Sequence, residues 1–405
     1  MSNQTAIHRE EKSSMNNQYK AVKEMRRLTS PFPESTAVKD WKAQGKRVIG
    51  YVGPAVPEEM IHAAKMLPLR VSGDNEPVPT NTVDTYLMPN VSTFARSVCQ
   101  TVLDGKWDFL DGAVVSIVNE GTRRLYDPWL AYKRRSYMDS IYLPLKQTEH
   151  AVDMYLADLE DWRDRISEFR GARIVDRDLR RSIEVYNRGR ELMQQFYELR
   201  KRERPPVTGA ETLEVIKAAT RLPRDQFNQL LEQLLDEIKR TGREIKKAKR
   251  LMIIGSQLEN STWIEAIEAL VTVVVTDELE AGTRYFWGKV DTKLPPMEAL
   301  ARYYISGRPP GARIWPAGKR FEHIFNMAGQ YKVDGVISEI LRNDAEYGHD
   351  KLFLDKEMKE RGIPILDLDV EYGESGSGQM RTRVEAFLEM VQNRPKAPTG
   401  KSPKK

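Results

Sequence analysis

Short apolar strands alternate with helix-forming segments in two separate parts of this chain, and this alternation constrains the fold more than any other feature. In the first part, residues 47–53, 67–71 and 109–117 are short runs rich in β-branched and apolar residues. Helix-forming segments, 57–65 and 94–103, lie between them. Strands that alternate with helices in this way pair in parallel, and the helices cover the faces of the sheet. The sequence therefore predicts an α/β unit here.

The same alternation returns in the C-terminal part of the chain. Residues 251–256, 272–277, 334–340 and 364–370 are predicted strands with helices between them. We therefore expect an α/β fold with two doubly wound (Rossmann- or flavodoxin-like) parallel-sheet domains. Ligands of such folds bind beyond the carboxyl ends of the strands, so the loops that follow the strands are the places to search for a site.

A helical region separates the two units. Three long, charged segments in it, 151–162, 178–199 and 226–238, have the pattern of helices. We interpret the region as a helical layer that joins the two domains. The predicted organisation is an N-terminal helical segment (1–45), a first α/β domain (46–145), a helical connecting region (146–250), a second α/β domain (251–392) and a disordered basic tail (393–405).

Charge and composition restrict the classes of function. The chain has 64 basic and 59 acidic residues, and its net charge of +5 is small for 405 residues. We interpret the basic tail as solvated, and no basic stripe with interleaved aromatic residues predicts a nucleic-acid interface. No apolar run is long enough to predict a membrane span, and the polar N-terminus does not resemble a secretory signal. We expect a cytoplasmic protein that binds neither nucleic acid nor membrane.

Cys99 is the only cysteine of the chain. One thiol cannot form a disulfide within the chain, a structural zinc site or a cysteine-bound cluster. The five histidines lack the spacing of a metal site, so we expect no metal ligands. The glycine-rich segment 374–379 precedes a predicted helix and is a weak candidate for binding an anion, although a flexible turn explains it as well.

Polar groups that can converge follow the ends of the predicted strands. Asn119 and Asp344 are also good helix N-caps, so capping alone can explain them. His349 is the only histidine predicted to lie in a loop at a pocket. The candidate residues in these loops are Ser92, Arg96, Asn119, Glu120, Arg123, Arg124, Asp344 and His349.

These loops, together with residues 57–70, resemble the family of benzoyl-CoA reductases and 2-hydroxyacyl-CoA dehydratases, and in particular the B-type subunit of the reductases. The resemblance extends from about residue 47 to about residue 390. It is strongest in segments 282–287, 296–304, 334–337, 362–372 and 378–389.

The resemblance implies a fold, a cofactor and a substrate class. It implies two doubly wound domains with a 4Fe–4S cluster between them, which three cysteines of each subunit hold. It implies a heterodimer that receives an electron from a separate ATP-dependent activator. The implied substrate is an acyl or aroyl coenzyme A thioester, in a process such as anaerobic aromatic degradation.

The chain departs from the family at every cluster ligand. The resemblance places the three cysteines at Ser92, Asn119 and Asp344, and two further cysteines of the relatives, near Glu280 and at Gly311, are also absent. Hydroxyl, amide and carboxylate oxygens are hard ligands that do not replace thiolates in an iron–sulfur site. We therefore expect this chain to hold no cofactor and the cluster to lie only in a partner subunit. Cys99 should be a small core residue of a helix.

Two functions remain open. In the first, the chain is a cluster-free subunit of a heteromeric acyl-CoA or aroyl-CoA enzyme, which supports a cysteine-bearing paralogous partner and contributes to thioester binding. In the second, it is an acyl-CoA isomerase, hydratase or dehydratase without redox chemistry. Glu120, Asp344 and His349 would then be its acid–base groups, and Ser92 and Asn119 would bind the thioester carbonyl.

Arginines near these loops are candidates for binding the phosphates of coenzyme A, because a guanidinium group forms paired hydrogen bonds with phosphate. Arg96, Arg123 and Arg124 lie at predicted helix starts, and Arg381 and Arg383 follow the glycine-rich segment. Surface arginines without a ligand are an equally good interpretation of the same residues.

Overall fold

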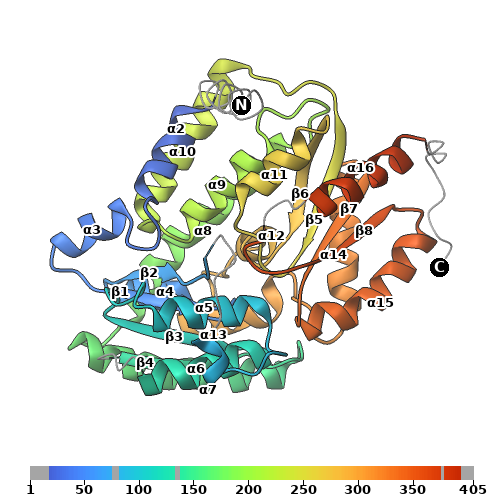
Figure 1. Ribbon diagram of the computed structural model, residues 1–405. Coiled ribbons are helices and arrows are strands. Elements are labelled where there is room, and N and C mark those ends of the chain that lie inside the picture. Colours follow the sequence, from blue (N-terminus) through green and yellow to red (C-terminus); the bar gives the residue numbers. More distant parts are fainter. Residues whose placement is uncertain (1–17, 75–81, 133–136, 375–377, 394–405) are drawn as a thin grey trace.

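The computed structural model describes residues 18–74, 82–132, 137–374 and 378–393. Nearly all of the predicted basic tail, the first 17 residues of the predicted N-terminal segment and the middle of the glycine-rich segment 374–379 lie outside the described residues. Two parallel sheets, each flanked by helices, form the body of the molecule (Figure 1). The predicted fold class is therefore confirmed.

The first sheet has four parallel strands in the order β2–β1–β3–β4. Three of them are predicted strands, and the fourth was missed because Asp139 and Ser140 give it the polarity of a loop. Arg165 pairs with Asp139 at 2.7 Å, so a neighbouring cation compensates this buried charge. The elements are β1 (Val48–Val52), α4 (Glu58–Ala63), β2 (Leu67–Arg70), η1 (Val83–Thr85), α5 (Thr93–Leu103), β3 (Gly112–Ile117), α6 (Glu120–Tyr132) and β4 (Tyr137–Tyr142).

The second sheet repeats this topology with four parallel strands in the order β6–β5–β7–β8, all of them predicted. Its elements are β5 (Lys249–Gly255), α11 (Ser261–Glu268), β6 (Thr272–Glu278), α12 (Thr283–Phe286), α13 (Pro296–Arg302), the π-helical turn η2 (Tyr303–Gly307), α14 (Gly318–Gln330), β7 (Gly335–Leu341), α15 (Ala345–Glu360), β8 (Ile365–Val370) and α16 (Gly378–Gln392). In both sheets the strand order reverses between the first and third strands in chain order, which is the switch point where ligands of such folds bind.

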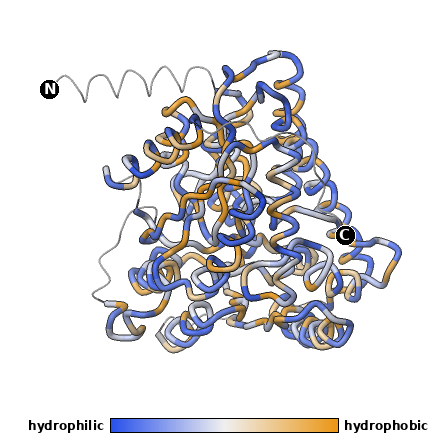
Figure 2. The backbone as a smooth tube through the Cα atoms, turned by 90° about the vertical axis from the view of Figure 1, so that its right-hand side faces the viewer, coloured by the Kyte–Doolittle hydropathy of each residue, from blue (hydrophilic) through white to orange (hydrophobic). Residues whose placement is uncertain are grey.

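Helices from the middle of the chain pack against both sheets. The four long helices are α7 (Glu149–Arg170), α8 (Asp176–Leu199), α9 (Gly209–Ala219) and α10 (Arg224–Thr241), and two N-terminal helices, α2 (Lys20–Leu28) and α3 (Thr36–Ala43), precede the first sheet. Trp162 of α7 is buried in the core under the first sheet, and Phe227 of α10 is buried in the core that includes strands of the second. Along the helices, apolar and polar residues alternate, as expected for helices with one buried face (Figure 2).

The C-terminal half of the chain also contributes to the core of the first sheet. Leu300 of α13 and Tyr303 of η2 pack there with Ile49 and Val114. The exact boundaries of the predicted domains therefore stay a prediction. Within the described ranges, no helix combines the length and the apolar character needed to cross a membrane.

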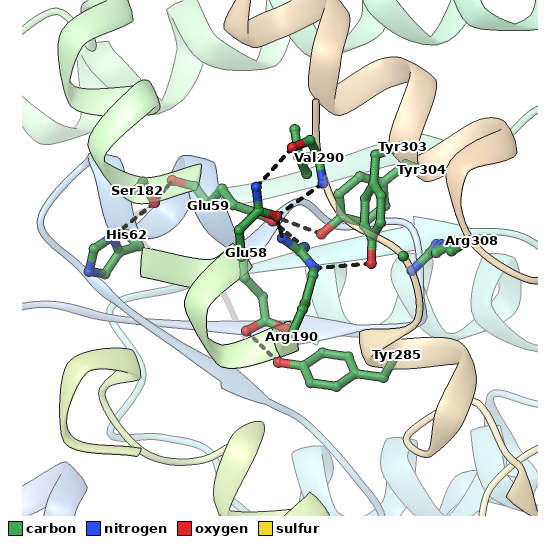
Figure 3. A network of polar contacts seen from close by, with 12 residues as sticks. Glu58, Glu59, His62, Ser182, Arg190, Tyr285, Val290, Tyr303, Tyr304 and Arg308 are labelled. Carbon is green, nitrogen blue, oxygen red and sulfur yellow. Dashed lines mark hydrogen bonds and ion pairs between the residues drawn. The ribbon is translucent and has the colours of Figure 1, made fainter. Parts of the chain in front are cut away.

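Two adjacent glutamates at the start of α4 connect the elements around the first sheet. Glu58 and Glu59 are 4% and 0% exposed. Glu59 pairs with Arg190 of α8 and accepts a hydrogen bond of 3.0 Å from the Tyr304 hydroxyl (Figure 3). Glu58 pairs with Arg224 of α10 at 3.1 Å. Burial opposes ionisation of Glu59, but the charge and hydrogen bond of Arg190, together with hydrogen bonds from the backbone and Tyr304, outweigh burial and lower the pKa of Glu59. Both glutamates are thus held as parts of buried ion pairs.

We expect Arg190→Met to lower the free energy of unfolding by about 3–5 kcal/mol, because Glu59 would remain in the interior without its cation. Urea denaturation followed by circular dichroism measures this difference. Arg188→Met is a matched control on the same helix, since Arg188 is half exposed and pairs with Glu232 at the surface. This control should change stability by less than about 1 kcal/mol. Equal losses in the two variants would contradict the importance of the buried pair.

Candidate functional site

A cleft of about 750 Å³ lies where the carboxyl ends of the strands of both sheets meet. Pro54, Asn119 and Leu143, which follow β1, β3 and β4, line it from the first sheet. Glu280, after β6, and Glu346, after β7, line it from the second. The cleft is therefore at the position that the doubly wound topology predicts for a ligand.

The walls of the cleft combine an apolar surface with a few polar groups. The apolar residues are Val118, Leu143, Pro144, Ile305, Pro309, Pro310, Ala312 and Ile314. The polar and charged residues are Asn119, Gln147, Glu280, Arg284, Arg308, Glu346, Tyr304 and Tyr347. Sites for small organic ligands typically have this composition, with apolar area for affinity and a few polar groups for orientation.

The π-helical turn η2 shapes one side of the cleft. It continues directly from α13, and π-turns within helices are frequent at functional sites. Tyr304 and Ile305 of this turn line the cleft, as does Arg308 immediately after it. The hydroxyl of Tyr304 donates to buried Glu59, so the ion pairs of α4 hold this wall in place.

Three helices begin at the residues that the resemblance aligns with cluster cysteines, and of these three residues Asn119 lines the cleft. Ser92 caps α5, with its Oγ accepting from the N–H of Ala95 at 3.4 Å. Asn119 precedes α6, and its Oδ1 accepts from the N–H of Thr122 at 2.9 Å. Asp344 occupies the N-cap position of α15. Capping therefore accounts for Ser92 and Asn119, in agreement with the simpler interpretation of the sequence.

The structure brings these three positions together. A Cβ atom at Gly121 would lie 2.9 Å from Ser92 Oγ and 3.4 Å from Asn119 Oδ1, so these two side chains flank the same small space. The N–H of Thr93 donates to the carbonyl of Arg342 at 3.2 Å, which joins the segment of Ser92 to the segment of Asp344. Loops that are far apart in sequence thus converge, as the sequence predicts.

Asp344 is the buried carboxyl group of this convergence. It is 9% exposed, and its Oδ1 has no hydrogen-bond partner among the described residues. Burial, and then the negative charge of Glu346, raise the pKa of Asp344 to about 7. Glu346 itself pairs with Arg313 at 3.1 Å. At neutral pH Asp344 is therefore divided between its acid and its carboxylate, which suits a group that exchanges protons.

The other two predicted acid–base residues lie elsewhere. The sequence predicts that His349 lies in a loop, and this prediction is wrong. Helix α15 begins at Ala345 and continues through Gly348. His349 is consequently on an exposed part of α15. Glu120 is exposed and pairs with Arg124 at 2.6 Å, one helical turn away. Of the three residues, only Asp344 is buried at the convergence.

None of the five predicted phosphate-binding arginines lines the described cleft. Arg96 is buried, pairs with Asp84 and donates to the carbonyl of Leu87 at 3.1 Å, so its role is structural. Arg124 is in the surface pair with Glu120, and Arg123 is exposed beside it.

The two C-terminal arginines are on the exposed surface of α16. Arg381 pairs with Glu385 at 3.0 Å, and Arg383 donates to the carbonyl of Asp367 at 2.7 Å. The arginines that do line the cleft, Arg284 and Arg308, were not predicted. Arg284 lies in one of the segments that resemble the family, and that resemblance is the signal that could have found it.

The donors at the convergence do not fit an iron–sulfur cluster. Ser92, Asn119 and Asp344 offer oxygen and amide groups, whereas such clusters require thiolates. Cys99 is 1% exposed in the apolar core, and burial raises its pKa to about 12, so it is the core residue that the sequence predicts and not a thiolate. In the described part of the chain, no group of three or more histidine, cysteine, aspartate and glutamate side chains is placed to hold a metal ion.

Comparison with known proteins gives one family for most of the chain. Residues 55–391 match the model of the family described as 2-hydroxyglutaryl-CoA dehydratase, D-component. The chain is 29% identical over 275 residues to the C-type subunit of benzoyl-CoA reductase of Thauera aromatica, covering 67% of this chain and 71% of the relative. Because that relative is a C-type and not a B-type subunit, the B-type assignment stays a prediction.

Two dehydratase subunits are similar over a longer range. The (R)-phenyllactyl-CoA dehydratase beta subunit of Clostridium sporogenes is 22% identical over 360 residues, covering 89% of this chain and 96% of the relative. The beta subunit of (R)-2-hydroxyglutaryl-CoA dehydratase of Acidaminococcus fermentans is 23% identical over 366 residues, covering 88% and 95%. Relatives from both branches of the predicted resemblance are therefore found.

The raised pKa of Asp344 predicts how stability changes with pH. A carboxyl group whose pKa is higher in the folded than in the unfolded chain stabilises the fold below its unfolded pKa, near 4, and this contribution disappears as the pH rises through about 7. Asp344→Asn removes the titration. We expect the stability of this variant relative to wild type to improve by roughly 1–4 kcal/mol between pH 4 and pH 8. Urea denaturation at each pH tests this, and a difference that does not change with pH would contradict it.

Proposed function

This chain belongs to the 2-hydroxyglutaryl-CoA dehydratase D-component family, and from that premise we propose that it is a cluster-free subunit of a heteromeric acyl-CoA or aroyl-CoA enzyme. In this role it supports a cysteine-bearing paralogous partner and binds part of the thioester. The observation that carries the proposal is the set of Ser92, Asn119 and Asp344 at three converging helix starts, where the family resemblance places cluster cysteines.

The chemistry of these three residues supports a scaffold that is stable without a cluster. The first N–H groups of a helix have no partner within the helix, and a capping side chain satisfies one of them at a gain of about 1 kcal/mol. Ser92 and Asn119 do this for α5 and α6. Two of the three positions that lack thiolates are thus occupied by residues that stabilise the local structure by themselves.

The cleft gives the chain a way to bind the thioester. Its apolar wall suits the acyl group. Because Asn119 uses its Oδ1 for capping, its amide NH₂ group remains as a donor toward a thioester carbonyl. Arg123, which is exposed and has no ion-pair partner among the described residues, is the best of the five predicted arginines for a coenzyme A phosphate.

The electron chemistry belongs to the partner in this proposal. An iron–sulfur cluster in the partner, reduced by an ATP-dependent activator, would supply the electron. This chain would hold the thioester, exclude water from the cleft and keep the partner in position. The cytoplasmic location and the role in anaerobic aromatic degradation expected from the sequence are parts of the same proposal.

A second candidate function rests on Asp344 alone. It is buried at the convergence with a pKa of about 7, which favours proton transfer in an isomerase, hydratase or dehydratase without redox chemistry. Glu120 and His349 give this alternative no geometric support, since both are exposed. The first function therefore has the stronger support.

We expect a tagged copy of the chain, purified from its native host, to return a stoichiometric complex with a cysteine-bearing paralogue. Mass spectrometry and iron analysis of the complex identify the partner and its metal content. A homo-oligomer without any paralogue would contradict the first function. Turnover of an acyl-CoA by the isolated chain, lost in Asp344→Asn, would support the second function in its place.

A triple variant tests whether the three converging positions can hold a cluster when their thiolates are restored. After anaerobic reconstitution with iron and sulfide, the variant with Ser92→Cys, Asn119→Cys and Asp344→Cys should bind about four iron atoms and absorb in the iron–sulfur charge-transfer region, whereas wild type should not. Thr148→Cys, Thr208→Cys and Asn260→Cys, at the N-caps of α7, α9 and α11, form the control with the same number of thiols. A stoichiometric cluster in the wild-type chain would overturn the proposal.

A further inference from the structure

Arg284 is a buried cation in the wall of the cleft, and the protein holds two of its three guanidinium nitrogens. It lies in α12 and is 6% exposed. Its Nε forms an ion pair with Oε1 of Glu278 at 3.0 Å, and its Nη2 donates a hydrogen bond of 3.2 Å to the carbonyl of Gly255. Glu278 is the last residue of β6 and Gly255 is the last residue of β5. Two neighbouring strands of the second sheet therefore fix the orientation of this guanidinium group.

The third nitrogen of Arg284, Nη1, lies against Gly311 at the wall of the cleft. A Cβ atom at Gly311 would lie 2.7 Å from Nη1, and both residues line the cleft. Among the described residues, Nη1 has no hydrogen-bond or ion-pair partner, in contrast to Nε and Nη2. Because Gly311 has no side chain, nothing from this position covers the N–H groups of Nη1.

The carboxylate that Arg284 contacts is shared with a second cation. Glu278 is 0% exposed, and Arg320 donates to both of its oxygens, at 3.1 and 2.8 Å. Glu278 therefore has no oxygen to spare for Nη1. Buried donors in native proteins nearly always have an acceptor. The N–H groups of Nη1 thus indicate an acceptor that enters the cleft.

The surroundings of Nη1 favour an uncharged oxygen as this acceptor. Gly311 lies between Pro310 and Ala312, and all three line the cleft. Two carboxylates, Glu280 and Glu346, are in the same lining and disfavour a further anion. In the ligand of the proposed function, the thioester carbonyl is an uncharged oxygen acceptor directly next to the acyl chain. An apolar wall with one exposed donor suits this group.

We propose that Nη1 of Arg284 donates a hydrogen bond to the thioester carbonyl, and that Gly311 keeps this donor accessible. The inference rests on the proposed function, in which the thioester occupies the cleft and Asn119 donates to the same carbonyl. A carbonyl oxygen has two lone pairs and accepts from both donors. Fixed donors in a cleft that excludes water stabilise negative charge on such an oxygen more strongly than water does. Arg284 and Asn119 together then form a two-donor site for the carbonyl.

Two matched ligands test the proposal in binding experiments with the full-length chain. Pentanoyl-CoA and its thioether analogue S-pentyl-CoA have chains of equal length and differ in the carbonyl. We expect isothermal titration calorimetry to show that wild type binds the thioester roughly tenfold more tightly or better, as a hydrogen bond from a charged donor provides. Arg284→Lys keeps a positive charge for Glu278 but has no third nitrogen, so it should lose most of this preference.

Three further variants separate the donor from the stability of the buried ion pair. Arg320→Lys makes the same change at the other cation of Glu278, which does not line the cleft, and it should retain the full preference. Gly311→Ala leaves Arg284 in place but adds a methyl group against Nη1, so it should lose most of the preference. Gly318→Ala is its control, because a Cβ atom at Gly318 meets open space. Circular dichroism establishes that each variant is folded.

The carbonyl itself gives a second measurement, which a purely structural role of Arg284 would not affect. Hydrogen bonding to a carbonyl oxygen lowers its stretching frequency. With pentanoyl-CoA labelled with ¹³C at the carbonyl, isotope-edited infrared spectroscopy should show a lower frequency in the wild-type complex than in solution. The shift should be smaller in Arg284→Lys and Gly311→Ala and unchanged in Arg320→Lys. If Arg284→Lys does not fold, Gly311→Ala against Gly318→Ala decides the question.

The outcomes distinguish this inference from the proposed function. Equal affinities of wild type for the two ligands would overturn the inference and leave the proposed function standing. The same holds if the preference and the infrared shift persist in Arg284→Lys and Gly311→Ala, or if Arg320→Lys loses them equally. If neither ligand, nor benzoyl-CoA, nor coenzyme A alone binds to the chain, thioester binding by this subunit is overturned, and the inference with it.

Discussion

The buried ion pairs of Glu58 and Glu59 are the constraint on which the rest of the structure depends. Two consecutive residues of α4 bind Arg224 of α10, Arg190 of α8 and Tyr304 of η2, so one short helix joins three parts of the chain. Each pair is stable only when both partners are in place, since an isolated buried charge costs several kcal/mol. The pairs therefore fix the wall of the cleft that η2 provides. The geometry of the candidate site is a consequence of this packing.

In the proposed function, the N-caps at Ser92 and Asn119 explain how the fold can persist without cluster ligands. Three helices that begin at one place bring together several unsatisfied N–H groups and the positive ends of their dipoles. Ser92 and Asn119 satisfy part of this need with neutral oxygens, and Asp344 adds a carboxyl group whose negative form the helix dipole favours and burial disfavours. Ser92 and Asn119 thus each have a local structural role, whereas the side chain of Asp344 makes no capping hydrogen bond.

Much of the fold could be predicted from the sequence, because strand and helix patterns are local. The seven predicted strands are present, and loops after them converge as parallel sheets require. Two predictions failed where the local sequence pattern differs from the structure. The polar Asp139 led us to miss the edge strand β4, and a glycine near the start of α15 led us to predict a loop at His349. The correct assignments depend on Arg165 and on where a helix begins, which the local composition does not reveal.

The site itself was harder to predict, because one of its charged residues, Arg308, comes from a segment whose position depends on tertiary packing. Arg308 follows α13 and η2, which lie between two strands of the second sheet in sequence but pack in the core of the first. No periodicity in the sequence shows that a helix crosses from one sheet to the other, or that the arginine after it lines the cleft.

Asp344 and Arg308 therefore differ in origin as well as in charge. Asp344 belongs to a strand-exit loop, the kind of position that doubly wound folds use for ligands, and the resemblance places a cluster cysteine there. Arg308 belongs to the wall of the cleft that η2 and the residues after it form. Side chains of this wall can change without altering either sheet. In a family whose members act on different acyl groups, as the names of the relatives state, variation in this wall is the simplest way to alter the acyl group while the fold is retained.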